Sequence, residues 1–475
     1  MTSGLPLEPS ADELADLSAG VVDFVARWVA GRADAPASNR FDPALPDLLK
    51  QLGGAPGEDG ASLDQLLAQV AEAATHGIDT AGPGYFGFVP GGGLITAALA
   101  DLVATAVNRS VGVAARGPAL AQMEAGAVDW IADLVGLPST TRGGILTSGG
   151  SMANFSAVIA ARAAKLPTDF LTGTLYATDQ THHSIAKAAM LAGFPPDGVR
   201  TVPTDRELRA DVDALRTMVA NDRRVGRRPF LVVANAGTTN TGAIDPLADL
   251  ADLAAAEDLW LHVDAAYGGF FLLTERGRSR LAGIDRVDSA TLDPHKSLFL
   301  PYGTGALVVR NVEALRRSHE IPGAYLQDLA AVPDVPDFAA LSPELSRDFR
   351  GLRVWLPLQL HGLAAFRAAL DEKLDLATQA HARLREVNGL EVPWTPQLSV
   401  VAFRHRNGPA ATRQVLEDLN AAQRVYLSST TIAGALTGRL CVLSHRTHAD
   451  RVDEAVDQIA RASAQISQMG AGTRP

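Results

Sequence analysis

Short runs of apolar and β-branched residues alternate with segments of helical periodicity from Gly143 onward. The apolar residues within each run are continuous, which is typical of strands that are covered on both faces of a sheet. Such strands in alternation with helices predict an α/β domain built on a mainly parallel, seven-stranded sheet with helices on both faces. The predicted strands are GILT (144–147), TLYAT (174–178), VRTVP (199–203), FLVVANAG (230–237), LWLHVDAA (259–266), DSATLDP (288–294) and GALVVR (305–310).

The segments on either side of this alternation predict two further parts. The first eighty residues have helical spacing, open at a capping box between Ser10 and Glu13, and are broken by Gly/Pro clusters between residues 53 and 60. They predict a helical arm at 1–80 without a core of its own. After Asp348 a long helical pattern leads into LSVVAFRH and RLCVLSH. We therefore expect a large domain at 81–365 and a small C-terminal α+β domain at 366–475.

Composition narrows the class of protein. The chain has 475 residues and a formal net charge of −11, which disfavours nucleic acid as a partner because phosphate binding needs a basic face. It contains no run of eighteen apolar residues, and its acidic N-terminus lacks the features of a signal peptide, so we expect a cytoplasmic protein that does not enter a membrane. Cys441 is the only cysteine, which excludes an intramolecular disulfide and a thiolate metal cluster. A small-molecule enzyme fits this composition best.

Amine chemistry has few candidates, because only five of the 42 basic residues are lysines. Four of them lie in helical contexts, where a solvated lysine is the ordinary interpretation. Lys296 instead follows Pro294 and His295 at the end of a predicted strand. Partial burial there would lower the pKa of the amine and let it attack an aldehyde, whereas a purely structural lysine would need an ion-pair partner.

Three other polar groups follow predicted strands, and ligands of such sheets bind at the carboxyl ends of the strands. TSGGSMANF places a Gly-Gly-Ser turn before a helix, which suits a phosphate, although a Gly-rich turn can also be purely structural. It matches neither GxGxxG nor a Walker motif, which disfavours nucleotide binding. DQTHHS offers an imidazole that could stack on a flat ring; zinc is disfavoured because adjacent histidines point apart. Asp264 ends LWLHVD and could cap a helix or hold a proton on a heteroaromatic nitrogen. Together with Lys296, these groups meet the requirements of pyridoxal 5′-phosphate.

Two motifs carry a family resemblance. HVDAAYGG and LDPHKSLFLPYGTG resemble the group II pyridoxal-phosphate-dependent amino-acid decarboxylases, and the likeness extends from about residue 80 to the C-terminus. It implies the fold type I architecture, and a homodimer with the active site at the subunit interface and the N-terminal arm packed across the partner. The site residues that it implies are Lys296 for the internal aldimine, Asp264 for the pyridine nitrogen, His182 for ring stacking, Gly150, Ser151, Asp293 and His295 for the phosphate and active-site contacts, Thr239 beside the cofactor, and Ala266 under the ring. Many relatives carry Asn where this chain has Asp293.

The resemblance also implies the reaction, which is decarboxylation of an L-amino acid to the amine and CO₂ through an external aldimine and a quinonoid. Tyr325, in SHEIPGAYLQDL, occupies the position of the family's proton donor to Cα. A decarboxylating aldehyde synthase, another fold type I enzyme such as an aminotransferase, and a pyridoxal-phosphate-binding homologue without turnover are the alternatives.

The substrate class follows from a second segment, GPGYFGFVPGGG. Its apolar residues, with two valines that relatives present across the dimer interface, favour an aromatic amino acid. Two observations keep acidic, polar or specialised amino acids open: the three glycines at 91–93 depart from aromatic decarboxylases, and nearby arginines could pair with an anionic side chain. The predicted pocket residues are Tyr85, Phe88, Val89, Val111 and Val113, and the arginines are Arg109, Arg116 and Arg347.

Overall fold

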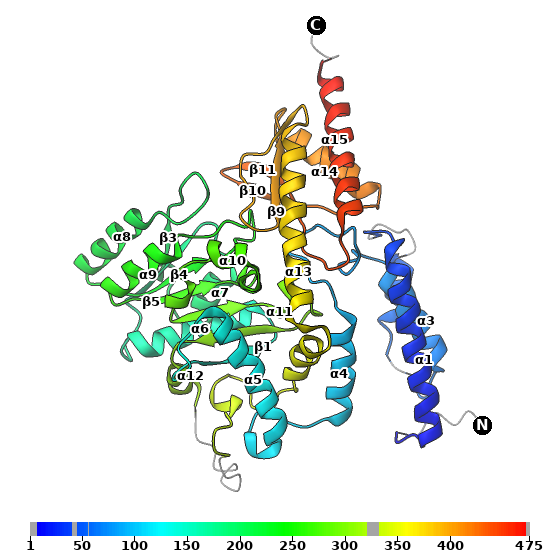
Figure 1. Ribbon diagram of the computed structural model, residues 1–475, viewed down its shortest axis with the longest axis horizontal. Coiled ribbons are helices and arrows are strands. Elements are labelled where there is room, and N and C mark those ends of the chain that lie inside the picture. Colours follow the sequence, from blue (N-terminus) through cyan, green and yellow to red (C-terminus); the bar gives the residue numbers. More distant parts are fainter. Residues whose placement is uncertain (1–6, 40–44, 56, 321–331, 472–475) are drawn as a thin grey trace.

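The computed structural model describes residues 7–39, 45–55, 57–320 and 332–471. A central sheet covered by helices forms the body of the protein, and a smaller sheet packed with its own helices forms a second part (Figure 1). The N-terminal helices α1 and α3 lie beside the body (Figure 1). Within these described ranges, no helix is both long enough and apolar enough to cross a membrane.

The central sheet has seven strands in the order β1-β7-β6-β5-β4-β2-β3. Strand β7 runs antiparallel to both of its neighbours, β1 and β6, and the other pairings are parallel. The continuous apolar runs of the sequence become strands because both faces are covered, and all seven predicted strands are confirmed. Their bounds are β1 Gly143–Thr147, β2 Gly173–Thr178, β3 Val199–Val202, β4 Arg228–Asn235, β5 Trp260–Asp264, β6 Ser289–Leu292 and β7 Gly305–Val309.

Helices connect these strands and bury their apolar faces against the sheet. The core between them is rich in Val, Leu, Ile and Ala from both the strands and the helices, including Ile131, Val232, Val263 and Leu292. The helices of this body are α4 Ile95–Val107, α5 Pro118–Val135, α6 Gly150–Lys165, α7 Ser184–Leu191, α8 Val212–Arg224, α9 Leu247–Ala256, α10 Glu275–Arg280, α11 Pro294–Ser297 and α12 Val312–His319.

The N-terminal helices are α1 Ala11–Ala30, α2 Leu45–Leu52 and α3 Leu63–Thr75. The predicted capping box at the start of α1 is confirmed: Ser10 accepts a hydrogen bond from the backbone of Glu13, and the Glu13 carboxylate accepts one from the backbone of Ser10. Helix α1 has no buried residue in this chain, so its apolar side chains lack the packing that stabilises most protein helices.

A single helix leads from the large sheet to the smaller one. Helix α13 (Gly351–Arg385) is interrupted at Gly362, whose φ of 69° lies in the left-handed region that glycine tolerates. Beyond it an antiparallel sheet has the strand order β10-β11-β9-β8. LSVVAFRH contains its strand β9, and RLCVLSH begins with the last three residues of β11. The remaining bounds are β8 Leu390–Glu391, β9 Val400–His405, α14 Pro409–Ala421, β10 Ser428–Ile432, β11 Ala435–Cys441 and α15 Ala449–Ala471.

Candidate active site

A cavity lies at the carboxyl ends of the central strands, and all nine residues predicted to bind the cofactor line it. They come from five different segments of the chain: the turn after β1, the loop after β2, the loop after β4, the end of β5 and the segment after β6. The nine are Gly150, Ser151, His182, Thr239, Asp264, Ala266, Asp293, His295 and Lys296. Tyr325, the fourth predicted catalytic residue, lies outside the described residues.

Lys296 faces two carboxylates. Its Nζ lies 3.1 Å from Oδ2 of Asp293, whose side chain is 2% exposed. Burial alone would lower the pKa of the Lys296 ammonium, but Asp293 and Asp264 outweigh burial and raise that pKa above its usual value. The sequence predicted a lowered pKa for Lys296, and this prediction is wrong. Burial at a strand end could be inferred from the sequence, but the proximity of the two carboxylates to the amine could not.

Asp264 is held in a fixed orientation at the end of β5. Its Oδ1 accepts a hydrogen bond from the backbone N–H of Ala266 at 3.1 Å, and its Oδ2 accepts one from Nδ2 of Asn154 at 2.9 Å. The carboxylate is 8% exposed and lines the cavity. Such a carboxylate can keep a proton on a ring nitrogen through a charge-assisted hydrogen bond.

The imidazole of His182 lines the same cavity. Its Nδ1 is 2.8 Å from the hydroxyl of Ser184 and 3.3 Å from the backbone N of Ser184. Burial lowers the pKa of His182, and Asp264 only partly opposes this effect. The ring is therefore neutral at physiological pH and presents a flat, uncharged face to a ligand.

The turn before α6 provides room and donors for an anion. Gly149 has a φ of 151°, and an added Cβ on Gly150 would lie 2.9 Å from Oδ2 of Asp293, so this backbone approaches its neighbours more closely than a side chain allows. No side chain in the described part of the protein caps α6, which leaves its N-terminal N–H groups available to an anion.

These features fit pyridoxal phosphate on structural grounds. Lys296 offers an amine, Asp264 a carboxylate for the ring nitrogen, His182 a flat ring, and α6 an anion site. Ala266 is small enough to leave space beneath a ring. The carboxylate of Asp293 is the one group here that does not favour the phosphate, because its negative charge lies near the turn that would bind this anion. Its Oδ1 is buried and has no hydrogen-bond partner among the described residues.

None of the five residues predicted for the substrate pocket lines this cavity. Tyr85 stacks on Tyr426, with ring centroids 5.9 Å apart. Phe88 is 54% exposed, and Val89 packs against the main core. Val111 and Val113 are buried, and Val111 packs in a cluster with α4 and α5 residues. Within one chain, these side chains are therefore separate from the cofactor cavity.

The fold requires each of the three glycines of the same segment, Gly91 and Gly92 because of close packing and Gly93 because its φ of 64° lies in the left-handed region. An added Cβ on Gly91 would lie 2.3 Å from the carbonyl oxygen of His295, and one on Gly92 would lie 2.3 Å from Nδ1 of His445. The segment therefore packs its bare backbone directly against the stretch that carries Lys296, and Arg446 binds the carbonyl of Gly92. A larger residue would displace one of these two segments.

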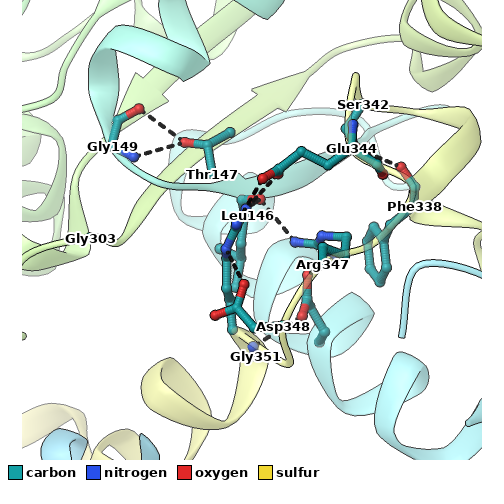
Figure 2. A network of polar contacts seen from close by, with 12 residues as sticks. Leu146, Thr147, Gly149, Gly303, Phe338, Ser342, Glu344, Arg347, Asp348 and Gly351 are labelled. Carbon is teal, nitrogen blue, oxygen red and sulfur yellow. Dashed lines mark hydrogen bonds and ion pairs between the residues drawn. The ribbon is translucent and has the colours of Figure 1, made fainter. Parts of the chain in front are cut away.

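Arg347, a candidate for pairing with an anionic substrate, has another role. Its Nη1 lies 2.5 Å from Glu124 Oε1, with the two side chains 1% and 0% exposed. Its Nη2 donates to the carbonyl of Leu146 at 2.9 Å, next to Thr147, whose hydroxyl bonds to Gly149 (Figure 2). Arg347 thus supports the turn before α6 from behind and is not free for a substrate. Arg109 and Arg116 are exposed and do not line the cavity.

The cavity also contains polar residues that the sequence did not single out: Asn154, Asn235, Thr238 and Tyr267. Asn154 lies one helical turn after Gly150, where a polar residue among small ones was the only available signal. Ser184, which supports His182, belongs to the DQTHHS motif but was not assigned a role.

The fold and this site define a pyridoxal-phosphate-dependent enzyme of fold type I. The pyridoxal-dependent decarboxylase conserved domain matches residues 46–406, and the chain belongs to the family of pyridoxal-dependent decarboxylases, which are carboxy-lyases.

Individual relatives align over almost the whole chain. The aromatic-L-amino-acid decarboxylase of Bacillus atrophaeus is 35% identical, covering 97% of this chain and 98% of the relative. The L-2,4-diaminobutyrate decarboxylase of Rhizobium meliloti is 30% identical, covering 94% of this chain and 90% of the relative. The crystal structure of Oryza sativa TDC with PLP and tryptamine matches with a TM-score of 0.91 at 28% identity, covering 98% of this chain and 100% of that chain.

The pairing of Lys296 with Asp293 predicts how the enzyme takes up its cofactor. Asp293→Asn removes the nearer carboxylate, so the pKa of Lys296 falls and more of the amine is unprotonated at neutral pH. It also removes a negative charge from near the turn that would bind the phosphate. We expect the variant to capture pyridoxal phosphate faster at neutral pH and its rate to rise at lower pH than in the wild type.

Stopped-flow absorbance of the ligand-free protein mixed with pyridoxal phosphate measures this rate from pH 6 to pH 9. Asp169→Asn, at an exposed position, is the matched control and should leave the profile unchanged. An Asp293→Asn profile that coincides with the wild type, or moves to higher pH, would contradict the pairing.

Proposed function

We propose that this enzyme decarboxylates an aromatic L-amino acid to the corresponding amine. The observation that carries the proposal is the assembly of all nine predicted cofactor residues around one cavity in a chain of this family. The aromatic substrate is supported by the 35% identical aromatic-L-amino-acid decarboxylase and by the likeness to a structure that contains tryptamine. The burial of Arg347 against Glu124 also removes one candidate partner for an acidic side chain.

The roles of the residues follow from their positions. When bound, pyridoxal phosphate supplies an electron-withdrawing ring that accepts the electron pair released with CO₂. Lys296 would hold the cofactor through its amine, and Asp264 would keep a proton on the ring nitrogen. His182 would stack on the ring above Ala266. Gly150, Ser151 and the start of α6 would bind the phosphate, with Thr239, Asp293 and His295 around it.

Tyr325 would deliver the proton to Cα after CO₂ leaves. This role rests on its place in the sequence, shortly after a Pro-Gly pair. Loss of that proton delivery would favour the aldehyde-forming alternative.

A homodimer is part of the proposal. Helices α1 and α4 expose apolar side chains that a second copy could cover, and such patches mark interfaces. These exposed residues are Leu14, Val22, Leu99, Leu102, Val103 and Val107.

The division into an arm at 1–80 and domains at 81–365 and 366–475 belongs to the same proposal, as does a cytoplasmic location.

Relative kcat/KM values for a set of L-amino acids test the substrate class. We expect tryptophan, tyrosine, phenylalanine or a hydroxylated relative to exceed glutamate, aspartate and 2,4-diaminobutyrate by about 100-fold or more, which corresponds to roughly 2.7 kcal/mol. Preference for 2,4-diaminobutyrate or for an acidic amino acid would support the alternative and refute the aromatic assignment.

A further inference from the structure

A buried amide lies in the wall of the cofactor cavity. Asn154, in the second turn of α6, is 1% exposed. Its Nδ2 is 2.9 Å from Oδ2 of Asp264 and 2.9 Å from the hydroxyl of Ser184. Its Oδ1 is 2.7 Å from the hydroxyl of Thr291 and 3.0 Å from Nε2 of His262. One side chain therefore connects α6, α7, β5 and β6.

The direction of these hydrogen bonds is fixed. An ionised carboxylate only accepts, so the NH₂ group of Asn154 must face Asp264 and its oxygen must face His262. His262 therefore donates from Nε2. Its Nδ1 then accepts from the hydroxyl of Ser289, 2.8 Å away, and that hydroxyl oxygen accepts from the indole N–H of Trp260.

The buried state of His262 agrees with this direction. Complete burial lowers the pKa of His262 to about 4, although Asp264 opposes the effect. The ring is therefore neutral and has a single proton, which the Asn154 oxygen places on Nε2. Trp260, Ser289 and His262 thus hold the amide in one orientation from behind.

The same orientation extends to His182. Because the Ser184 oxygen accepts from Asn154, its own proton is free to donate to Nδ1 of His182, 2.8 Å away. The backbone N–H of Ser184 donates to the same nitrogen at 3.3 Å. Nδ1 of the neutral ring is therefore an acceptor. The ring proton must lie on Nε2, on the side away from Ser184, as a donor for a ligand in the cavity.

We propose that Asn154 is a positioning residue that sets two catalytic groups at once: it orients the carboxylate of Asp264 and, through Ser184, places the proton of His182 on Nε2. Asn154 acts in this proposal through its hydrogen bonds to Asp264 and Ser184. The proposal deepens the decarboxylase function and rests on it only for its catalytic consequence, because the hydrogen bonds themselves are independent of the substrate.

Asn154→Asp tests the proposal with almost no change in size. The new carboxylate has no donor for Ser184, so the Ser184 hydroxyl turns to donate to it and becomes an acceptor toward His182. We expect the proton of His182 to move from Nε2 to Nδ1. The carboxylate would also repel Asp264 at hydrogen-bond distance. We expect kcat to fall by about 10- to 100-fold, as for other outer-shell partners, with KM changing much less.

Nitrogen-15 NMR of histidine-labelled, ligand-free protein measures the proton position, with His182→Gln used to assign the signal. The wild type should show a protonated Nε2 and an unprotonated Nδ1 for His182, and Asn154→Asp should reverse them. The control Asn221→Asp, the same change at an exposed position of α8, should leave both nitrogens as in the wild type. An unchanged His182 signal in Asn154→Asp would overturn the proposal.

Ser184→Ala provides a second, smaller change in case Asn154→Asp does not fold. It removes the hydroxyl between Asn154 and His182 and leaves the amide bonded to Asp264. The backbone N–H of residue 184 still donates to Nδ1 of His182, so we expect the Nε2–H form to remain the major one and a minor Nδ1–H form to appear beside it. A His182 signal identical to that of the wild type would overturn the role of the Ser184 hydroxyl. The NMR result holds even for a protein that turns over no amino acid, so failure of the proposed function and failure of this inference remain distinguishable.

Discussion

Lys296→Ala should be unable to hold pyridoxal phosphate covalently and should lose decarboxylase activity by at least about three powers of ten, or roughly 4 kcal/mol. Lys296 is the one lysine that lines the cavity in the described part of the chain. The buried Lys373 cannot replace it, because its ammonium is bound by Glu372 and by the carbonyl of Thr447.

Borohydride reduction followed by peptide mass spectrometry checks this expectation. In the wild type the added mass of the cofactor should lie on the peptide that contains Lys296, and Lys296→Ala should show no added mass there. Lys187→Ala, an exposed lysine of α7, should retain both the attachment and the activity. Attachment at another lysine of the wild-type protein would remove Lys296 from this role.

Asp264→Asn should separate cofactor attachment from catalysis. The amide keeps the shape and can still bond to Asn154, but it lacks the charge that holds a proton on the ring nitrogen. Without that proton the ring is a much weaker acceptor for the electron pair released with CO₂. We expect kcat to fall by about three powers of ten, or roughly 4 kcal/mol, while covalent attachment to Lys296 persists.

The measurement combines kcat with the borohydride experiment on the same preparation. Asp169→Asn serves again as the exposed control and should retain wild-type kcat. A decrease of less than tenfold for Asp264→Asn would show that the ring proton is held by another group. Loss of attachment together with activity would indicate a role in binding instead.

The sequence predicted the sheet, Asp264 and Lys296 for a shared physical reason, whereas Thr239, Ala266, Asp293 and His295 were assigned only from the family resemblance. Strands buried on both faces need continuous apolar runs, so the polar residue that ends a run marks the end of a strand. Ligands bind at the carboxyl ends of such strands. Asp264 and Lys296 were therefore recognisable as polar residues at the ends of apolar runs. The antiparallel direction of β7 was not predictable in this way, because an apolar run has no direction.

Contacts that only the fold creates could not be predicted from the sequence. Asp293 is close to Lys296 in the chain, but only the fold directs its carboxylate toward the amine and reverses the expected pKa shift. Arg347 and Glu124 are 223 positions apart in the sequence, and nothing local indicated that they form a buried pair. Asn154 bonds to Asp264 across 110 positions.

The most direct test of the central claim is the reaction itself, run in D₂O. The purified protein, supplied with pyridoxal phosphate, is incubated with aromatic L-amino acids, and the products are identified by mass spectrometry. Decarboxylation followed by protonation predicts the corresponding amine with one deuterium at Cα and release of CO₂. A keto acid without CO₂ would indicate transamination, and an aldehyde as the main product would indicate the oxidative variant; either result would contradict the account.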